Sequence, residues 1–149
     1  MGGDVIKEAE EYWNSIRGAR LMPARADIVP EAIVKLLPNV ILMDVSHNPL
    51  NFRYRLIGTE IERHSAGNHT GQWITEIPER SPPSKVWDNL EAVIKERRPS
   101  TRSIPYVGRH RDFITTRQIT MPLSSNGTDI DMLFLVIDYV KKDIADLSG

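Results

Sequence analysis

The sequence predicts an α+β domain in which five antiparallel strands form one sheet. Two strand-like runs, residues 40–45 and 52–57, flank the turn residues His47-Asn48-Pro49 and therefore predict a hairpin. Helix-like segments follow this hairpin, so it has to join the rest of the sheet across them. Three further strand-like segments close the chain and can pair as a meander: residues 100–107, 112–123 and 130–141.

Length and composition restrict the class of protein. The chain has 149 residues and a mass of 17.0 kDa, the size of one domain. Hydrophobic residues make up 40% and charged residues 26%, which argues against a disordered chain and a membrane protein. The net charge of −1 argues against a dedicated nucleic-acid binder. No apolar run reaches the ~20 residues that span a bilayer, and the first residues lack a signal-peptide pattern. We therefore expect a soluble cytoplasmic protein.

An amphipathic helix is predicted over residues Val5–Arg17, with Asp4 as its N-cap and Gly18 as its stop. Its apolar stripe is broad, and residues 132–137 of the last strand are apolar on both faces. That strand needs cover on a second face, which a helix of the same chain or of a second copy can supply. We expect a homodimer, with these helix residues as its interface: Val5, Ile6, Ala9, Tyr12, Trp13 and Ile16.

Three shorter patterns complete the element order. A short helix is expected between Pro30 and Pro38, and Thr59 with Glu62 fits a capping box that opens another, ending near Ser65. The strongest helix should open at Ser81 or Pro82 and end at Arg98-Pro99, because apolar residues recur in it at helical spacing. The pair Asn126-Gly127 favours a tight hairpin between the last two strands.

This order of elements resembles that of the PAS fold, in which helices lie over one face of a five-stranded antiparallel sheet. The local sequence also resembles a group of short bacterial PAS proteins, and the likeness covers nearly the whole chain. The resembling pieces are Tyr12-Trp13, residues 21–27 (LMPARAD), residues 52–59 (FRYRLIGT), Thr70-Gly71 and the hairpin of residues 121–127.

The resemblance implies a sensor or interaction role and a ligand cavity between the concave sheet face and the helices. PAS domains commonly serve an attached kinase, cyclase or DNA-binding module, and no residues remain here for one. We therefore expect a stand-alone sensor that acts through a partner protein or its own oligomer. The expected organisation is a single domain over residues 1–149, with an N-terminal helix and connector in residues 1–26 and the PAS core in residues 27–149.

Strand parity indicates which residues could reach such a cavity. Arg117 interrupts an otherwise apolar row in its strand, and a guanidinium can hold a carboxylate or phosphate with two hydrogen bonds. An internal salt bridge, or a bulge that turns Arg117 outward, is the alternative. For Trp87, filling the core is favoured over lining a pocket, and Trp73 could close a loop over the cavity or plug the short-helix region. The candidate residues for a small, anionic ligand are Tyr54, Trp73, Trp87, Tyr106 and Arg117.

Three cofactors are disfavoured. The chain has no cysteine, which excludes a cysteinyl-flavin adduct and thiolate zinc sites. The long helix, where haem-binding PAS domains usually place the axial ligand, has no histidine. His64 and His69 are five residues apart across an expected helix end, a spacing that disfavours a zinc pair.

Three classes of function remain, in order of preference. The first is a sensor that binds a small molecule and signals through a homodimer or a signalling protein partner. The second is an interaction domain without a ligand. The third is a small curved-sheet isomerase or hydratase with Asp44 as its carboxylate, but Asp44 fits a solvent-facing strand end better. The chain has no Gly-x-Ser-x-Gly elbow and no glycine-rich phosphate loop, so we expect no enzyme, and we expect neither nucleic acid nor a membrane as partner.

Overall fold

A computed structural model describes residues 4–65, 67–105 and 113–141. Its centre is a five-stranded antiparallel sheet with the strand order β2-β1-β5-β4-β3. The sheet confirms the predicted fold class, because the hairpin pairs with the meander through β1 and β5. The strands are β1 (Val40–Ser46), β2 (Asn51–Ile57), β3 (Ser100–Pro105), β4 (Phe113–Leu123) and β5 (Met132–Lys141).

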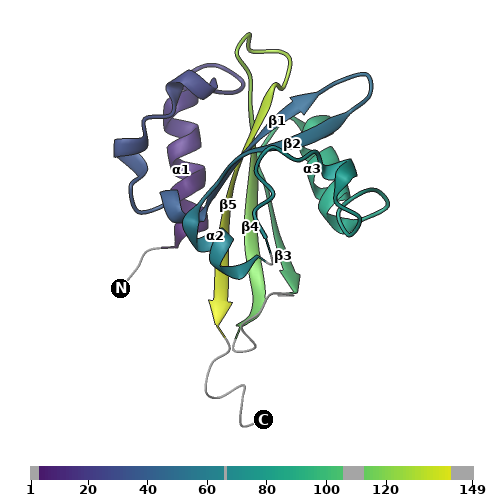
Figure 1. Cartoon of the computed structure of the whole chain (residues 1–149). Helices are drawn as coiled ribbons and strands as arrows, with labels where there is room; N and C mark the ends of the chain where they lie inside the picture. The colour runs from purple at the N-terminus through teal and green to yellow at the C-terminus, as the bar shows by residue number, and fades with distance from the viewer. Residues whose placement is uncertain (1–3, 66, 106–112, 142–149) are drawn as a thin grey trace.

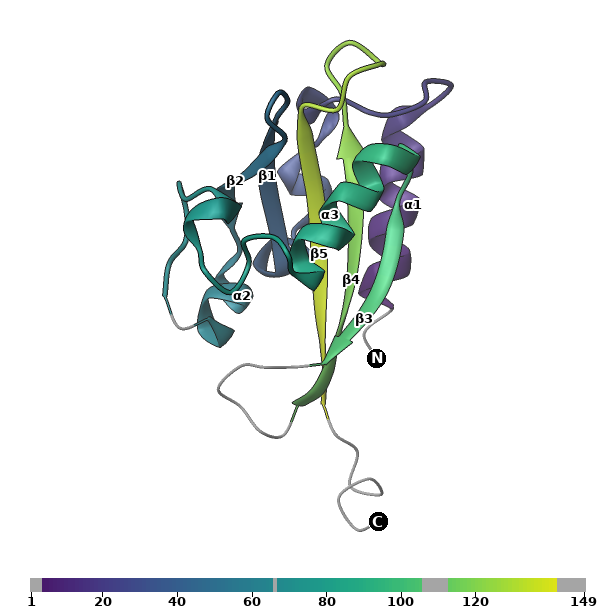
Figure 2. The same cartoon turned by 90° about the vertical axis from the view of Figure 1, so that its right-hand side faces the viewer.

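Helices cover the two faces of this sheet (Figures 1 and 2). Helix α1 (Val5–Arg17) lies against β4 and β5 on one face, together with the connector of residues 18–39. Helix α3 (Lys85–Glu96) crosses β4 on the opposite face. We call the α1 side the outer face and the α3 side the inner face. Among the described residues, no helix is both long and apolar enough to cross a bilayer.

Helix α1 packs on the sheet of its own chain. Asp4 caps it by accepting hydrogen bonds from the backbone N–H groups of Ile6 (3.0 Å) and Lys7 (3.3 Å). Ile6, Ala9 and Trp13 are buried, and the indole Nε1 of Trp13 donates to the carbonyl of Pro122 in β4 at 2.9 Å. Of the two kinds of cover that the sequence left open, the structure therefore contains the intramolecular one.

Strand β5 explains why both faces need cover. Leu133, Phe134, Leu135 and Val136 follow one another in the strand and are all buried, although alternate residues point to opposite faces. This agrees with the central, doubly covered strand that the sequence predicts. The inner and outer layers therefore share one hydrophobic core across the sheet.

Strand β2 departs from the expected alternation because of a bulge. Leu42 pairs with Leu56 and Met43 pairs with Tyr54, which leaves Arg55 without a partner in the register. Beyond the bulge the side chains change face. Leu56, predicted to share a face with Tyr54, is 43% exposed.

The connector contains 3-10 helices where the sequence predicts one short helix. They span Arg25–Asp27, Pro30–Ile33 and Leu37–Asn39. A proline lies at the first or second position of the second and of the third of these helices. Because proline fixes φ and has no N–H group, it favours the start of a new short turn over the continuation of one helix. The hydroxyl of Tyr12 accepts a hydrogen bond from the backbone N–H of Val29 at 2.8 Å and so ties the connector to α1.

The segment between β2 and β3 contains α2 (Thr59–His64), the 3-10 helix η4 (Ile74–Glu76) and α3. The N-cap of α2 is Gly58 rather than Thr59, so the predicted capping box does not form. A side chain at Gly58 would overlap the backbone oxygens of Leu37 and Pro38, which explains the glycine. Helix α3 begins later than predicted, because Ser84 caps it by accepting from the N–H of Trp87 at 3.0 Å.

The connection between β4 and β5 is longer than the predicted tight hairpin. Its residues 124–131 form a loop in which the side chain of Asn126 accepts from the N–H groups of Thr128 and Asp129, both at 2.8 Å. Asp131 closes the loop by accepting from the N–H of Ser125 at 2.8 Å. Asn126 therefore shapes a wider loop through its side chain, rather than occupying a two-residue turn.

Candidate functional site

Tyr54 is the centre of a polar cluster on the inner face. Its ring is buried, and its hydroxyl accepts a hydrogen bond from Nη1 of Arg80 at 2.9 Å. Burial raises the pKa of the Tyr54 hydroxyl, against the opposing effect of the Arg80 cation. The hydroxyl thus stays protonated at neutral pH. Arg80 also lies over the Tyr54 ring, with its guanidinium carbon 5.5 Å from the ring centroid.

His69 extends this cluster along the β2 edge. Its ring centroid is 6.3 Å from that of Tyr54, and its Nδ1 is 2.6 Å from the side-chain oxygen of Gln72. The backbone fixes the arrangement, because Tyr54 donates to the carbonyl of Gln72 at 3.0 Å and accepts from the N–H of Gly71 at 2.7 Å. These two backbone hydrogen bonds hold residues 71–72 beside β2.

Arg80 is held by the turn that precedes α3. Its backbone N–H donates to the carbonyl of Ile77 at 2.9 Å, and its carbonyl accepts from the hydroxyl of Ser84 at 2.7 Å. The side chain is only partly exposed, and among the described residues it forms no ion pair with a carboxylate. A guanidinium in this position can still bind an anionic group through its remaining N–H donors.

Aromatic and aliphatic side chains fill the inner face next to this cluster. Phe52 in β2 is fully buried, and its ring contacts that of Trp87 in an edge-to-face arrangement with centroids 5.2 Å apart. Leu90 and Val93 continue the buried surface of α3. Trp87 is partly buried and shares the inner face with Tyr54, so the structure places these two candidates together.

Arg117 lies on the other side of the sheet. Its Nη1 is 3.4 Å from both carboxylate oxygens of Asp4, the cap of α1 on the outer face. Its register partner in β5 is Asp138. The predicted grouping of Arg117 with Tyr54 and Trp87 in one cavity is therefore wrong. The internal salt bridge, which the sequence left open as the alternative, is present.

Trp73 is also separated from Tyr54. It pairs with Arg53 in an isolated bridge and lies under the Arg53 guanidinium, 5.2 Å from its carbon. Direct partners in an antiparallel pair share a face, and Arg53 alternates with Phe52 and Tyr54, so Trp73 lies on the outer side. Tyr106, the remaining candidate, lies outside the described residues.

Asp44 forms an ion pair with Arg53 on the same outer side. One carboxylate oxygen accepts from Nε (3.1 Å) and Nη2 (2.9 Å) of Arg53, and Arg55 lies 3.7 Å away. The structure thus gives Asp44 a cross-strand partner rather than a position on the inner face. This geometry favours the structural role over that of an enzyme carboxylate.

His47 and His64 each contact a different part of the chain. Nε2 of His47 is 2.8 Å from the carbonyl oxygen of Ile130. His64 is buried with its Nε2 3.3 Å from Glu60, and its ring stacks on Tyr139 with centroids 3.9 Å apart. Within residues 4–65, 67–105 and 113–141, no three His, Asp or Glu side chains are placed to hold a metal ion together.

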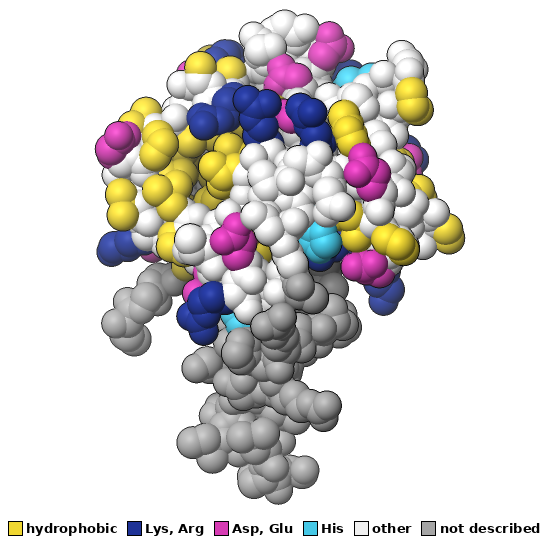
Figure 3. All heavy atoms as spheres, viewed as in Figure 1, with side chains coloured by type: hydrophobic (Ala, Val, Ile, Leu, Met, Phe, Trp, Pro, Cys, Tyr) yellow, Lys and Arg dark blue, Asp and Glu magenta, His cyan; other side chains and the backbone are white. Residues whose placement is uncertain are grey.

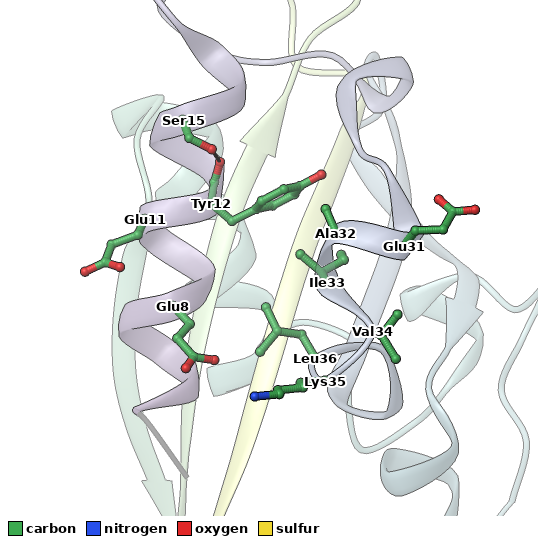
Figure 4. Close-up of a pocket in the computed structure, with 10 residues that line it drawn as sticks. All are labelled: Glu8, Glu11, Tyr12, Ser15, Glu31, Ala32, Ile33, Val34, Lys35 and Leu36. Carbon is green, nitrogen blue, oxygen red and sulfur yellow. Dashed lines mark hydrogen bonds between the residues drawn. The ribbon is translucent and has the colours of Figure 1, made fainter.

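A groove of about 600 Å³ lies on the outer face, between α1 and the connector (Figure 4). Of the predicted interface residues, Tyr12 lines this groove. The groove is separate from the Tyr54–Arg80 cluster, because α1 and α3 lie on opposite sides of the sheet. The side chains that line it are Glu8, Glu11, Tyr12, Ser15, Glu31, Ala32, Ile33, Val34, Lys35 and Leu36.

Sequence reasoning missed Arg80 and His69 as members of the inner-face cluster. Both lie in irregular segments, where no strand or helix period indicates the direction of a side chain. Tyr54 was found because it lies in a strand with clear alternation. A cation four residues before the Ser84 cap of the long helix is the only sequence signal that could have indicated Arg80.

Comparison with known proteins identifies the fold family. The family model described as "PAS domain" matches residues 1–136, and the chain therefore belongs to the PAS domain family. This confirms the family that the sequence resembles, and PAS domains are in general sensory, non-enzymatic modules.

A solved structure shares this fold. The crystal structure of a sensory box sensor histidine kinase from Vibrio cholerae superimposes with a TM-score of 0.52 at 16% sequence identity. The match covers 74% of this chain and 91% of that chain. No curated protein matches the chain.

Proposed function

We propose that this PAS domain is a sensor for a small molecule with an anionic group, bound on the inner face at Arg80. The observation that carries the proposal is the state of Arg80. It is partly buried beside the Tyr54 ring, donates to the Tyr54 hydroxyl and has no carboxylate partner among the described residues. The remaining N–H groups of this partly buried guanidinium have no carboxylate acceptor among the described residues, and a ligand carboxylate or phosphate would supply one.

The neighbouring groups suit the rest of such a ligand. The Tyr54 hydroxyl has no acceptor for its own proton among the described residues, so it can donate to a ligand oxygen. The rings of Tyr54, His69 and Trp87 offer apolar and stacking surface on the same side of the sheet. The site thus combines one cation, one hydroxyl and aromatic side chains, which is the mixture that small-molecule sites use.

A conformational change caused by the ligand would be transmitted to a partner through α3 and the surface of the domain. Arg80 lies in the turn that caps α3, so a ligand that draws its guanidinium inward favours one position of that turn over others. The receiver would be a second copy of the chain or a signalling protein. For a homodimer through α1, Val5, Tyr12 and Ile16 are the predicted residues that stay partly exposed.

The second candidate is an interaction domain without a ligand. It is favoured by the packing of Phe52 against Trp87 and by the buried side chains of Leu90 and Val93, which leave that part of the inner face filled. In this case Arg80 would only stabilise the position of Tyr54 and of the turn before α3. The cytoplasmic location and the division into residues 1–26 and 27–149 stay predictions under either candidate.

Thermal unfolding in the presence of a library of carboxylic and phosphorylated metabolites tests the proposal. A ligand at 100 times its dissociation constant adds about 2.7 kcal/mol of stability. We expect acids that raise the melting temperature of the wild type and of Arg117→Gln, but not of Arg80→Gln. Arg117 is the matched control because its guanidinium binds Asp4 on the outer face. A library without any stabilising acid, or one whose acids act equally on Arg80→Gln, would support the interaction domain.

A further inference from the structure

We propose that the groove between α1 and the connector is the docking site for an amphipathic helix of a partner protein, one that carries basic residues beside its apolar face. The inference names the kind of partner and its surface, and it rests on the proposed signalling role. It involves the outer face and is independent of whether the inner face binds a ligand.

The shape of the groove suits a helix. Tyr12 extends from α1 toward the connector, and Ile33 and Leu36 point back toward α1, so these three side chains form an apolar floor (Figure 4). The α1 wall runs from Glu8 to Ser15, which is about 10 Å or two helical turns. Two turns present three apolar side chains at positions i, i+4 and i+7, the usual spacing of helix-in-groove anchors.

Exposed large apolar side chains are frequent in the connector, and one of them, Val34, lines the groove. Leu21 is 58%, Val29 50% and Val34 62% exposed, and all three lie in residues 18–39. Figure 3 shows hydrophobic side chains gathered on the side of the molecule where α1 and the connector lie. Single exposed apolar residues are common, but a group beside a groove indicates a binding surface.

The charge of the walls indicates what the partner carries. Glu8 and Glu11 line the groove from α1 and Glu31 lines it from the connector; the side chains of Glu11 and Glu31 point away from the gap and lie at its rims (Figure 4). None of the three forms an ion pair with another described residue. Lys35 is the one basic side chain among those that line the groove. Three carboxylates against one ammonium leave a net charge of −2, which attracts lysine and arginine and repels an acidic helix.

A hydrogen bond links the two walls, so the groove is already formed in a single copy of the chain. The Tyr12 hydroxyl accepts from the N–H of Val29, and Leu36 and Ile33 are buried below it. A helix can therefore dock without first opening the core, and it would contact α1 and the connector directly.

A display library of helical peptides tests the proposal on the full chain. Peptides of about 14 residues, or four turns, would carry apolar residues at i, i+4 and i+7 and random residues beside them. We expect selection to enrich lysine and arginine at the random positions. The best synthetic peptide should bind at least tenfold more weakly to Val34→Glu and several-fold more weakly to Glu31→Lys, and added salt should weaken it further.

Two matched variants control for general surface effects. Leu56→Glu changes an exposed apolar residue on β2, and Glu62→Lys reverses an exposed charge on α2, so neither should alter the affinity. Absence of enrichment, enrichment of acidic peptides, or binding that Val34→Glu leaves unchanged would overturn the proposal. A wild-type dimer in solution that Val34→Glu converts to a monomer would overturn it too, because a second copy would then occupy the groove. The metabolite response of Arg80→Gln is a separate readout, so failure here leaves the sensor proposal to its own test.

Discussion

Replacing Trp13 with phenylalanine tests whether α1 belongs to the core of its own chain. The Trp13 side chain is almost fully buried, at 3% exposure, and its Nε1 donates to the carbonyl of Pro122 at 2.9 Å. Loss of this donor leaves a buried acceptor unpaired, which costs about 1–3 kcal/mol. The smaller ring removes further apolar volume, about 1–2 kcal/mol at ~0.8 kcal/mol per CH₂-sized group. We expect a total destabilisation of about 2–5 kcal/mol.

Urea unfolding measures this loss, and Trp73→Phe is the matched control. Trp73 is partly exposed and stacks under Arg53, an interaction of about 0.5–1 kcal/mol. Trp13→Phe should lower the urea midpoint much more than Trp73→Phe, with the same slope for both. An equal loss in the two variants would refute the packing of α1 described above. So would a Trp13→Phe effect that depends on protein concentration, because α1 would then pack on a second copy.

Three further predictions concern backbone space and titratable groups. Gly58→Ala should destabilise the chain by about 1–3 kcal/mol in urea unfolding, because the new Cβ would overlap the Pro38 carbonyl; an unchanged midpoint would contradict this close approach. The hydrogen bond from the backbone N–H of Lys7 lowers the pKa of the Asp4 carboxyl in the folded chain. The cap therefore stabilises the folded chain at a pH above the unfolded pKa, and this stabilisation is lost as the pH falls through the folded pKa. Asp4→Ala should therefore cost about 0.5–2 kcal/mol at pH 7 and progressively less in acid, and a constant cost across that pH range would argue against the cap. Burial raises the pKa of Asp138, so its ionisation costs stability as the pH rises through the folded pKa. Asp138→Asn should raise the melting temperature at pH 7 but not below the unfolded pKa, and a lowered melting temperature at pH 7 would show that its attraction to nearby cations dominates.

The strands could be predicted from the sequence because their patterns are local. Residues 132–137 are apolar at every position, which requires cover on both faces wherever the strand lies. The hairpin of β1 and β2 follows from two β-rich runs around a turn that contains Asn48-Pro49. The family resemblance then placed the hairpin and the meander in one five-stranded antiparallel sheet.

The site could be predicted only in part, because strand parity depends on register. Arg117 belongs to an apolar row, but the row does not say which face of the sheet it occupies, and α1 brings Asp4 to it from 113 residues away. In β2 the bulge at Arg55 moves Leu56 to the outer face, and no residue type marks that bulge in advance. Arg80 reaches Tyr54 only because a turn folds back before α3.

The three tryptophans provide the most direct test of the anion site, because each reports on a different place. Trp87 lies on the inner face near Tyr54, Trp13 lies on α1 and packs against β4, and Trp73 lies beside Arg53. The measurement is the set of indole N–H resonances in a nitrogen–proton correlation spectrum during titration with the acids that stabilise the protein. The account predicts that the Trp87 resonance shifts saturably, that the other two stay in place, and that Arg80→Gln abolishes the shift. A response confined to Trp13 or Trp73, or one that persists in Arg80→Gln, would contradict it.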